Sequence, residues 1–148
     1  MTTFTIISVG KLKEKYFSDT ADEYIKRVSA FGKINIVDLK EIHNEKETAT
    51  KFLQSVPANS FVFALCIEGK QLSSEKFAEK LETVYISEKK GVCFLIGGSE
   101  GLPESVKQIA DIKLSMSEMT FPHRLAKIML LEQLYRALSI QNNGKYHK

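Results

Sequence analysis

The chain has 148 residues and a mass of 16.7 kDa, which is the size of one domain. With 43% hydrophobic and 26% charged residues, its composition excludes a disordered or fibrous protein. The net charge is only +3, and no apolar run approaches the roughly 18 residues of a membrane span. We therefore expect one cytoplasmic domain spanning residues 1–148. Its cysteines, Cys66 and Cys93, are expected to be free because disulfides are rare in that compartment.

Apolar runs and helix-like patterns alternate along the chain. The first half predicts a strand over 3–9, a helix over 14–31, a strand over 34–39 and a helix over 44–56. A strand over 60–67 is expected to end at Gly69, before a helix capped by Ser73 or Ser74. The last third predicts a strand over 92–96, a short helix after Pro103, a strand over 112–116 and a helix over about 122–141. This alternation predicts an α/β domain with a mainly parallel sheet and helices on both faces.

The last predicted helix is apolar around more than half of its circumference. A helix that packs on one sheet needs an apolar stripe of only about 100°. A second subunit, or another part of the same chain, must cover the remaining apolar surface of this helix. We favour a homodimer, because closed twofold dimers are the commonest oligomers.

The basic excess lies in the last fifth of the chain. Residues 1–120 carry 16 bases and 17 acids, whereas residues 121–148 carry five bases against Glu132, a net +4. The final residues, Gly144-Lys-Tyr-His-Lys148, combine rings and ammonium groups that suit the bases and phosphates of single-stranded RNA. The alternative interpretation is a solvated helix face with a frayed end, in which Glu132 and Arg136 pair at i,i+4.

Three loops follow the carboxyl ends of the later strands, where open α/β sheets bind ligands. They are Glu68–Lys70, Gly97–Gly101 and Ser115–Pro122. Paired glycines allow close backbone approach to a ligand, although a tight turn alone would also explain them. Glu100 and Glu118 disfavour a polyphosphate. They favour a ligand with ribose hydroxyls, an amino group or a sulfonium, which points to S-adenosylmethionine rather than ATP or NAD.

Other constellations that carry chemistry are missing from the sequence. The three histidines, His43, His123 and His147, form no i,i+4 pair and have no cysteine nearby, so we expect no metal site. His123 follows Pro122 at the start of a helix, where the helix dipole favours a neutral imidazole with a structural role.

Four motifs of the C-terminal half, taken in order, resemble those of the ribosomal large-subunit methyltransferase H family of the SPOUT superfamily. They are Leu-Ile-Gly-Gly-Ser-Glu-Gly-Leu (95–102), Leu-Ser-Met-Ser-Glu-Met-Thr-Phe-Pro-His (114–123), Glu-Gln-Leu-Tyr-Arg-Ala (132–137) and Tyr-His-Lys (146–148). The start of the chain matches as well, through Ile-Ile-Ser-Val-Gly-Lys-Leu-Lys (6–13) and Tyr-Ile-Lys-Arg (24–27), so the resemblance covers essentially the whole sequence.

The resemblance implies a C-terminal trefoil knot that binds S-adenosylmethionine, and a homodimer. It also implies methylation of N3 of pseudouridine 1915 in 23S ribosomal RNA, within the assembled 70S ribosome. Knotted chains are rare exceptions, so nothing in the hydrophobic pattern could have indicated the knot. No membrane and no metal are implied.

By motif match, the resemblance also assigns site residues. Those expected to contact S-adenosylmethionine are Leu65, Gly98, Ser117, Glu118, Met119, Thr120, Phe121 and Pro122. Those expected to bind RNA are Tyr135, Arg136, Tyr146, His147 and Lys148, of which His147, Arg136 and Tyr146 are also candidate catalytic residues. The family usually has arginine where this chain has Lys148, so a planar, bidentate contact would be lost there while the charge is kept.

The implied reaction is an in-line displacement in which N3 of the pseudouridine attacks the sulfonium methyl group. His147 is a candidate base for the N3 proton, and unassisted loss of that proton to water is the alternative. Two other functions remain open at this point. One is a non-catalytic RNA-binding or ribosome-associated factor with the same fold. The other is a flavodoxin-like nucleotide-binding domain, which the acidic loops disfavour.

Overall fold

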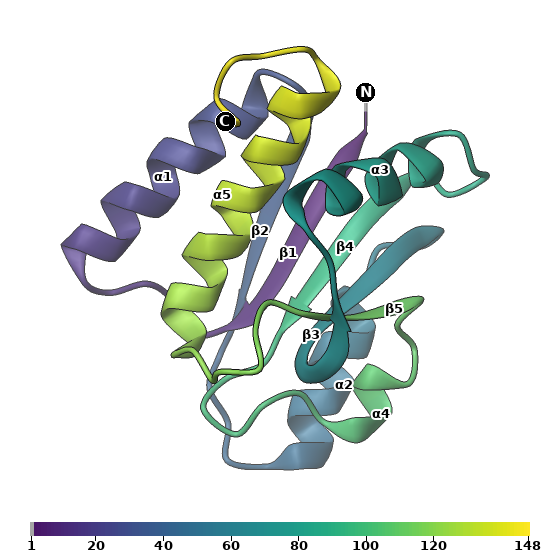
Figure 1. The fold of residues 1–148 in the computed structure, drawn as a ribbon. Coiled ribbons are helices and arrows are strands. Elements are labelled where there is room, and N and C mark those ends of the chain that lie inside the picture. The colour runs from purple at the N-terminus through teal and green to yellow at the C-terminus, as the bar shows by residue number, and fades with distance from the viewer. Residues whose placement is uncertain (1) are drawn as a thin grey trace.

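The computed structural model describes residues 2–148, as five strands and five helices in alternation (Figure 1). The strands are β1 (Thr3–Val9), β2 (Lys33–Leu39), β3 (Ser60–Gln71), β4 (Gly91–Ile96) and β5 (Ile112–Ser115). The helices are α1 (Lys15–Ser29), α2 (Glu45–Ser55), α3 (Ser74–Tyr85), α4 (Glu104–Lys107) and α5 (His123–Gln141). Every predicted element is present. Within the described residues, no helix is long and apolar enough to cross a membrane.

The strands form one sheet in the order β2-β1-β4-β3-β5, and every neighbouring pair is parallel. Helices cover both faces. In Figure 1, α1, α5 and α3 lie in front of the sheet, and α2 and α4 lie behind it. The single α/β domain with helices on both faces is therefore confirmed. The trefoil knot stays a prediction from the resemblance.

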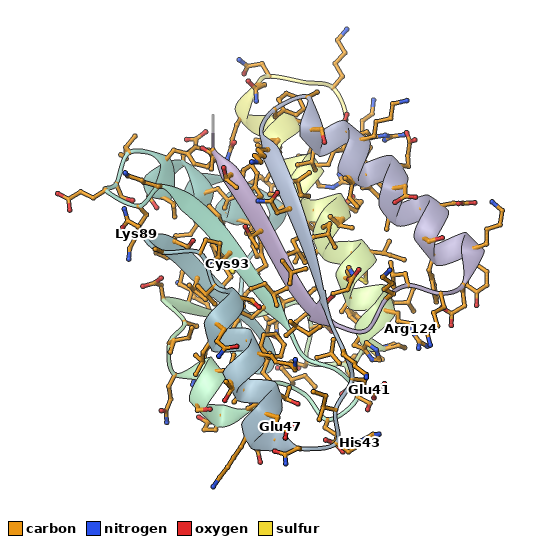
Figure 2. The ribbon with its side chains drawn as sticks, turned by 180° about the vertical axis from the view of Figure 1, so that it is seen from behind. Glu41, His43, Glu47, Lys89, Cys93 and Arg124 are labelled. Carbon is orange, nitrogen blue, oxygen red and sulfur yellow. The ribbon has the colours of Figure 1, made fainter. Side chains whose placement is uncertain are left out.

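Each face of the sheet has its own hydrophobic core, because alternate side chains of a strand point to opposite faces. Phe4 and Ile6 of β1 join the core under α1, α3 and α5, whereas Ile7 and Val9 join the core under α2 and α4. Cys93 belongs to the second core, and Figure 2 shows it on β4 from that side. Burial raises the pKa of its thiol to about 12, and both cysteines are free.

One predicted boundary is wrong. β3 does not end at Gly69 but continues to Gln71, and its pairing with β5 shifts in register between Leu65 and Lys70. A Cβ atom on Gly69 would lie 2.7 Å from the carbonyl oxygen of Lys113. The segment Glu68–Lys70 is thus an irregularity of β3 packed against β5 and not a free loop. A glycine needed for close approach between two backbones gives the same sequence signal as a turn glycine.

α5 is central to the fold, because α1 and α3 both pack against it. Its buried residues on this face include Leu130, Leu131 and Leu134. More of the same chain therefore covers much of the apolar surface of α5, which was one of the two interpretations given above. Leu125 and Met129 keep 39% and 38% of their surface exposed.

Candidate functional site

Two regions collect the residues predicted to be functional. The first, which we call the loop edge, lies where β4, β3 and β5 end. These three strands are parallel neighbours, so their carboxyl ends meet at one edge of the sheet. The loop edge comprises the irregular β3 segment 65–70, the glycine loop 97–101 and the loop 116–122 that leads into α5. It contains all the residues that the sequence assigned to the cofactor.

The glycine loop is shaped by its backbone. Gly98 and Gly101 form an isolated antiparallel bridge, and the amide of Gly101 donates to the carbonyl of Gly98 at 3.0 Å. Gly101 has φ +78°, and a Cβ atom on Gly97 would clash with the backbone of Gly101 and Leu102. The loop can close on itself only because these positions lack side chains. Its tip leaves Glu100 exposed.

The loop 116–122 holds its shape by short-range hydrogen bonds at its start. The hydroxyl of Ser115 donates to the carbonyl of Ser117 at 2.9 Å, and the hydroxyl of Ser117 accepts from the amide of Met119 at 3.0 Å. The following side chains are open to solvent: Met119 is 75% exposed, and Glu118 and Thr120 are exposed too. This loop therefore presents an apolar side chain and a carboxylate together.

The start of α5 is tied to β2 and to the N-cap of α1. The ammonium of Lys127 is only 4% exposed and donates to Asp38, at the end of β2, at 2.6 Å. Arg124 pairs with Glu14 at 3.3 Å, and Figure 2 shows Arg124 at the end of the sheet opposite Lys89. Burial and Arg124 lower the pKa of His123, in line with the neutral imidazole expected there.

The second region is formed by the end of the chain, which folds back onto α5 (Figure 1). Gly144 allows this reversal, because a Cβ atom there would clash with the hydroxyl of Ser139. We call the region the tail cluster and define it by Tyr24, Glu75, Glu132, Arg136, Tyr146 and His147. It includes the predicted residues Arg136, Tyr146 and His147, and the predicted Tyr135 packs against it.

Tyr146 anchors the tail cluster. Its ring packs edge-to-face on Tyr135 at 4.7 Å, and the guanidinium of Arg136 lies 4.7 Å from its ring centre. Its hydroxyl donates to Glu132 at 3.3 Å and lies 3.4 Å from the hydroxyl of Tyr24. Burial, with Tyr24 and Glu132, raises the pKa of Tyr146 to about 12, so this phenol stays neutral at physiological pH.

Arg136 is held by a forked contact. Its Nε and Nη2 atoms donate to the carboxylate of Glu132 at 3.0 and 3.1 Å, and Nη1 donates to Nδ1 of His147 at 3.0 Å. The i,i+4 pairing of Glu132 and Arg136 expected from the sequence is present. A guanidinium has five N–H groups, so it keeps two for a ligand such as a phosphate.

The contacts of His147 determine which ring nitrogen carries the proton. Arginine can only donate, so Nδ1 of His147 is the acceptor and Nε2 carries the hydrogen. Nε2 then donates to the carboxylate of Glu75 at 2.7 Å, a contact that lowers the pKa of Glu75. Both ring nitrogens are therefore engaged, and Nδ1 of His147 is available to a substrate proton only after its contact with Arg136 is broken.

The structure shows how the bases of the last fifth of the chain are paired. Lys127 forms an ion pair with Asp38, Arg136 with Glu132, and Arg124 with Glu14. Lys145 and Lys148 are exposed, and Lys148 lies outside the tail cluster. The C-terminal region is therefore less cationic at its surface than its composition suggests.

Sequence reasoning missed two members of the tail cluster. Glu75 stands 72 positions from His147, and Tyr24 stands 122 positions from Tyr146. Tyr24 belongs to the stretch Tyr24–Arg27 that carried part of the resemblance, whereas nothing in the sequence singled out Glu75. Within residues 2–148, no group of three or more potential ligands could hold a metal ion.

Comparison with known proteins places the chain in a family. Residues 2–147 match a family model described as "Predicted SPOUT methyltransferase". The ribosomal RNA large subunit methyltransferase H of Alkaliphilus oremlandii is 44% identical over 156 residues, covering 97% of this chain and 98% of the relative. The enzyme of the same name from Ureaplasma parvum is 45% identical over 157 residues, with the same coverage.

The fold is also found among solved structures. A probable methylase family protein from Haemophilus influenzae superposes with a TM-score of 0.62 at 15% identity. The match covers 98% of this chain and 70% of that protein. Identity this low supports the fold alone.

Proposed function

We propose, from the premise that this chain belongs to the SPOUT methyltransferase family and is a relative of ribosomal RNA large subunit methyltransferase H, that it methylates 23S ribosomal RNA with S-adenosylmethionine as donor. The observation that carries the proposal is the ordered tail cluster. A tail that could have been a frayed end instead holds Arg136, Tyr146 and His147 together. Two N–H groups of Arg136 remain for RNA.

The loop edge has the chemistry to hold the donor. Its exposed carboxylates, Glu100 and Glu118, match ribose hydroxyls, an ammonium group or a positive sulfur, and Met119 offers an apolar contact. A side chain on Gly98 would fill the space beside Val9, where its Cβ atom would lie 3.3 Å away. When bound, S-adenosylmethionine supplies a methyl group activated by a positively charged sulfur. The loop residues then have only to orient it toward an acceptor.

The finer target follows from the resemblance of the sequence motifs. We propose that the acceptor is N3 of pseudouridine 1915, in the assembled 70S ribosome in the cytoplasm, and that the enzyme is a homodimer with a knotted C-terminal half. One small domain has little surface with which to hold naked RNA, so a preassembled substrate suits it. Leu125, exposed on α5, is a residue we expect a second subunit to contact.

The tail cluster also bears on the loss of the N3 proton. His147 has its free electron pair directed at Arg136, so a phosphate that draws Arg136 away would release Nδ1 as a base. Loss of the proton to water is the alternative route. The variant His147→Ala separates the two, because unchanged turnover with saturating ribosomes would remove His147 as the base.

The test of the proposed function is transfer of labelled methyl groups from S-adenosylmethionine to 70S ribosomes that lack the modification, with free 50S subunits alongside. We expect label in one pseudouridine of the large-subunit RNA, and only with 70S ribosomes. Calorimetric titration with S-adenosylmethionine is run in parallel.

The possible failures differ in meaning. Cofactor binding without label on either particle would point to another RNA target. Neither binding nor label would refute the enzyme and leave a non-catalytic RNA-binding factor. Label on both particles would refute the requirement for an assembled ribosome.

A further inference from the structure

A cavity of about 280 Å³ lies between the loop edge and the tail cluster, and no residue assigned above to the cofactor or to RNA lines it. Its walls come from the start of α3, the end of β5 and one face of α5. The lining includes Leu72, Ser74, Phe77, Leu114, Met129 and Gln133. A volume just below the usual range for drug-sized ligands suits a single nucleobase.

The cavity adjoins both regions. Ser115 lines it at the end of β5, Met116 lines it as the first residue of the loop 116–122 of the loop edge, and Leu114 pairs in register with Leu65. On the other side, Ser74 precedes Glu75, which binds His147. An acceptor base has to lie between the methyl donor and the groups that hold its strand, and this cavity occupies that position.

The lining combines apolar side chains with the hydroxyls of Ser73, Ser74 and Ser115 and the carboxamide of Gln133. Phe77 is 5% exposed and Leu130 is fully buried, so they form a firm floor, while Met129 stays 38% exposed. Such walls accept the flat face of a base that has been turned out of its stack. Of the polar groups, the hydroxyl of Ser74 donates to Gln133 and that of Ser115 donates to the carbonyl of Ser117, whereas the carboxamide of Gln133 has hydrogen-bonding capacity left for a base.

The hydrogen bonds of Gln133 fix its orientation. Its oxygen accepts from the hydroxyl of Ser74 at 2.6 Å, and its nitrogen donates to Glu132 at 3.0 Å. A carboxamide has two N–H groups and two oxygen lone pairs, so one of each remains free. The free pair is complementary to an N–H beside a carbonyl on the edge of a base.

Resting on the proposed function, we propose that this cavity binds the target base and that Gln133 selects pseudouridine over uridine. Pseudouridine is attached to its sugar through carbon, so it offers N1–H next to C2=O. In uridine, N1 carries the sugar and has no hydrogen. Gln133 reads the N1–H and C2=O pair and leaves N3 free for methylation, and Ser74 is a positioning residue that holds the carboxamide.

The test uses Gln133→Met, which keeps the length of the side chain and removes both hydrogen-bonding groups. Methyl transfer is measured with 70S ribosomes that carry either pseudouridine or uridine at the target. We expect wild type to prefer pseudouridine by at least about tenfold in kcat/KM, because a site built to hydrogen-bond a group rejects the analogue that lacks it. Gln133→Met should lose this preference by slowing only the pseudouridine reaction.

The matched control is Gln141→Met. Gln141 lies on the same helix and likewise bonds a hydroxyl, that of Tyr85 at 3.2 Å, and a carbonyl, that of Ala78 at 2.9 Å, outside the cavity. Its variant should keep the preference. A readout independent of activity is the NMR signal of the Gln133 amide, which should shift with pseudouridine nucleoside and not with uridine.

The outcomes are distinguishable. A retained preference in Gln133→Met, or an equal loss on both ribosomes, overturns the assignment of Gln133 and leaves the proposed function intact. Failure of wild type on both ribosomes refutes the proposed function and the base cavity with it. Unchanged calorimetric binding of S-adenosylmethionine to Gln133→Met shows that the variant is folded.

Discussion

The loop edge and the tail cluster are built by opposite means. The loop edge takes its shape from the backbone: glycines let the loop 97–101 close on itself, and its side chains, such as Met119 and Glu118, are mostly exposed. The tail cluster takes its shape from side chains that pair across the fold, such as His147 with Glu75. A site shaped by backbone shows its glycines in the sequence, whereas a site shaped by distant pairing leaves no local pattern.

The two regions share α5. Its start follows the loop 116–122, and Glu132 and Arg136 near its other end hold the tail. Because the two regions lie at opposite ends of this helix, a variant in one region should leave the other intact unless it moves the helix itself.

The largest effect is expected from Arg136→Lys. Lysine keeps the charge but cannot hold Glu132 and His147 at once, so kcat/KM on 70S ribosomes should fall by roughly 10²–10³. Binding of S-adenosylmethionine, measured by calorimetry, should not change. The comparison is Arg27→Lys: Arg27 is half-buried, pairs at i,i+4 with Glu23 and lies over the rings of Tyr24 and Tyr135, but it holds neither Glu132 nor His147, so its loss should cost less than about threefold. Equal losses of activity in the two variants would contradict a special role for Arg136.

Lys127→Met should perturb both regions together. It leaves the carboxylate of Asp38 without its partner at the foot of α5, so the free energy of unfolding should fall by about 2–3 kcal/mol. This loss of stability is smaller than the usual one for breaking a fully buried ion pair, because the side chain of Asp38 is partly exposed to solvent. Urea unfolding checks the prediction, with Lys15→Met of the exposed pair with Asp19 as control. If adding Asp38→Leu brought no recovery, the ion pair would not be the cause.

Gly97→Ala should affect the loop edge alone. Its Cβ atom would meet the backbone of Gly101 and Leu102, so we expect a loss of about 1–3 kcal/mol of stability and at least tenfold weaker binding of S-adenosylmethionine. Gly101→Ala, where only the positive φ is strained, should cost about 1–2 kcal/mol. Calorimetry and urea unfolding compare the two. Identical affinities would show that closure of the loop does not shape the cofactor site.

The smallest effect is expected from lowering the pH, which should loosen the folded tail. His147 lowers the pKa of Glu75 below its ordinary value of 4.5, so the contact stabilises the folded tail fully above that pH. The contribution is lost as pH falls through the lowered pKa of the folded state. The tail should therefore loosen at acid pH before the domain unfolds, as seen in the NMR signals of His147. Glu75→Gln should remove this pH dependence, and a transition that persists in it would exclude Glu75 as its origin.

The sequence alone predicted the number, type and order of the elements, because alternation and helical periodicity are local properties. It also identified the glycine loop, the loop before α5 and the pairing of Glu132 with Arg136, which lie within single turns or segments. Ser73 is the N-cap of α3, one of the two residues expected, since its hydroxyl accepts from the amide of Lys76.

Only the tertiary structure decided the rest. The continuation of β3 past Gly69 depends on β5, which supplies the partners for Lys70 and Gln71 more than 40 positions later. The order of the tail depends on Glu75 of α3, and the orientation of Gln133 depends on Ser74 of the same helix. Such contacts form only after helices are packed on a sheet. Packing is set by the whole arrangement of buried side chains and not by the neighbours of a residue along the chain.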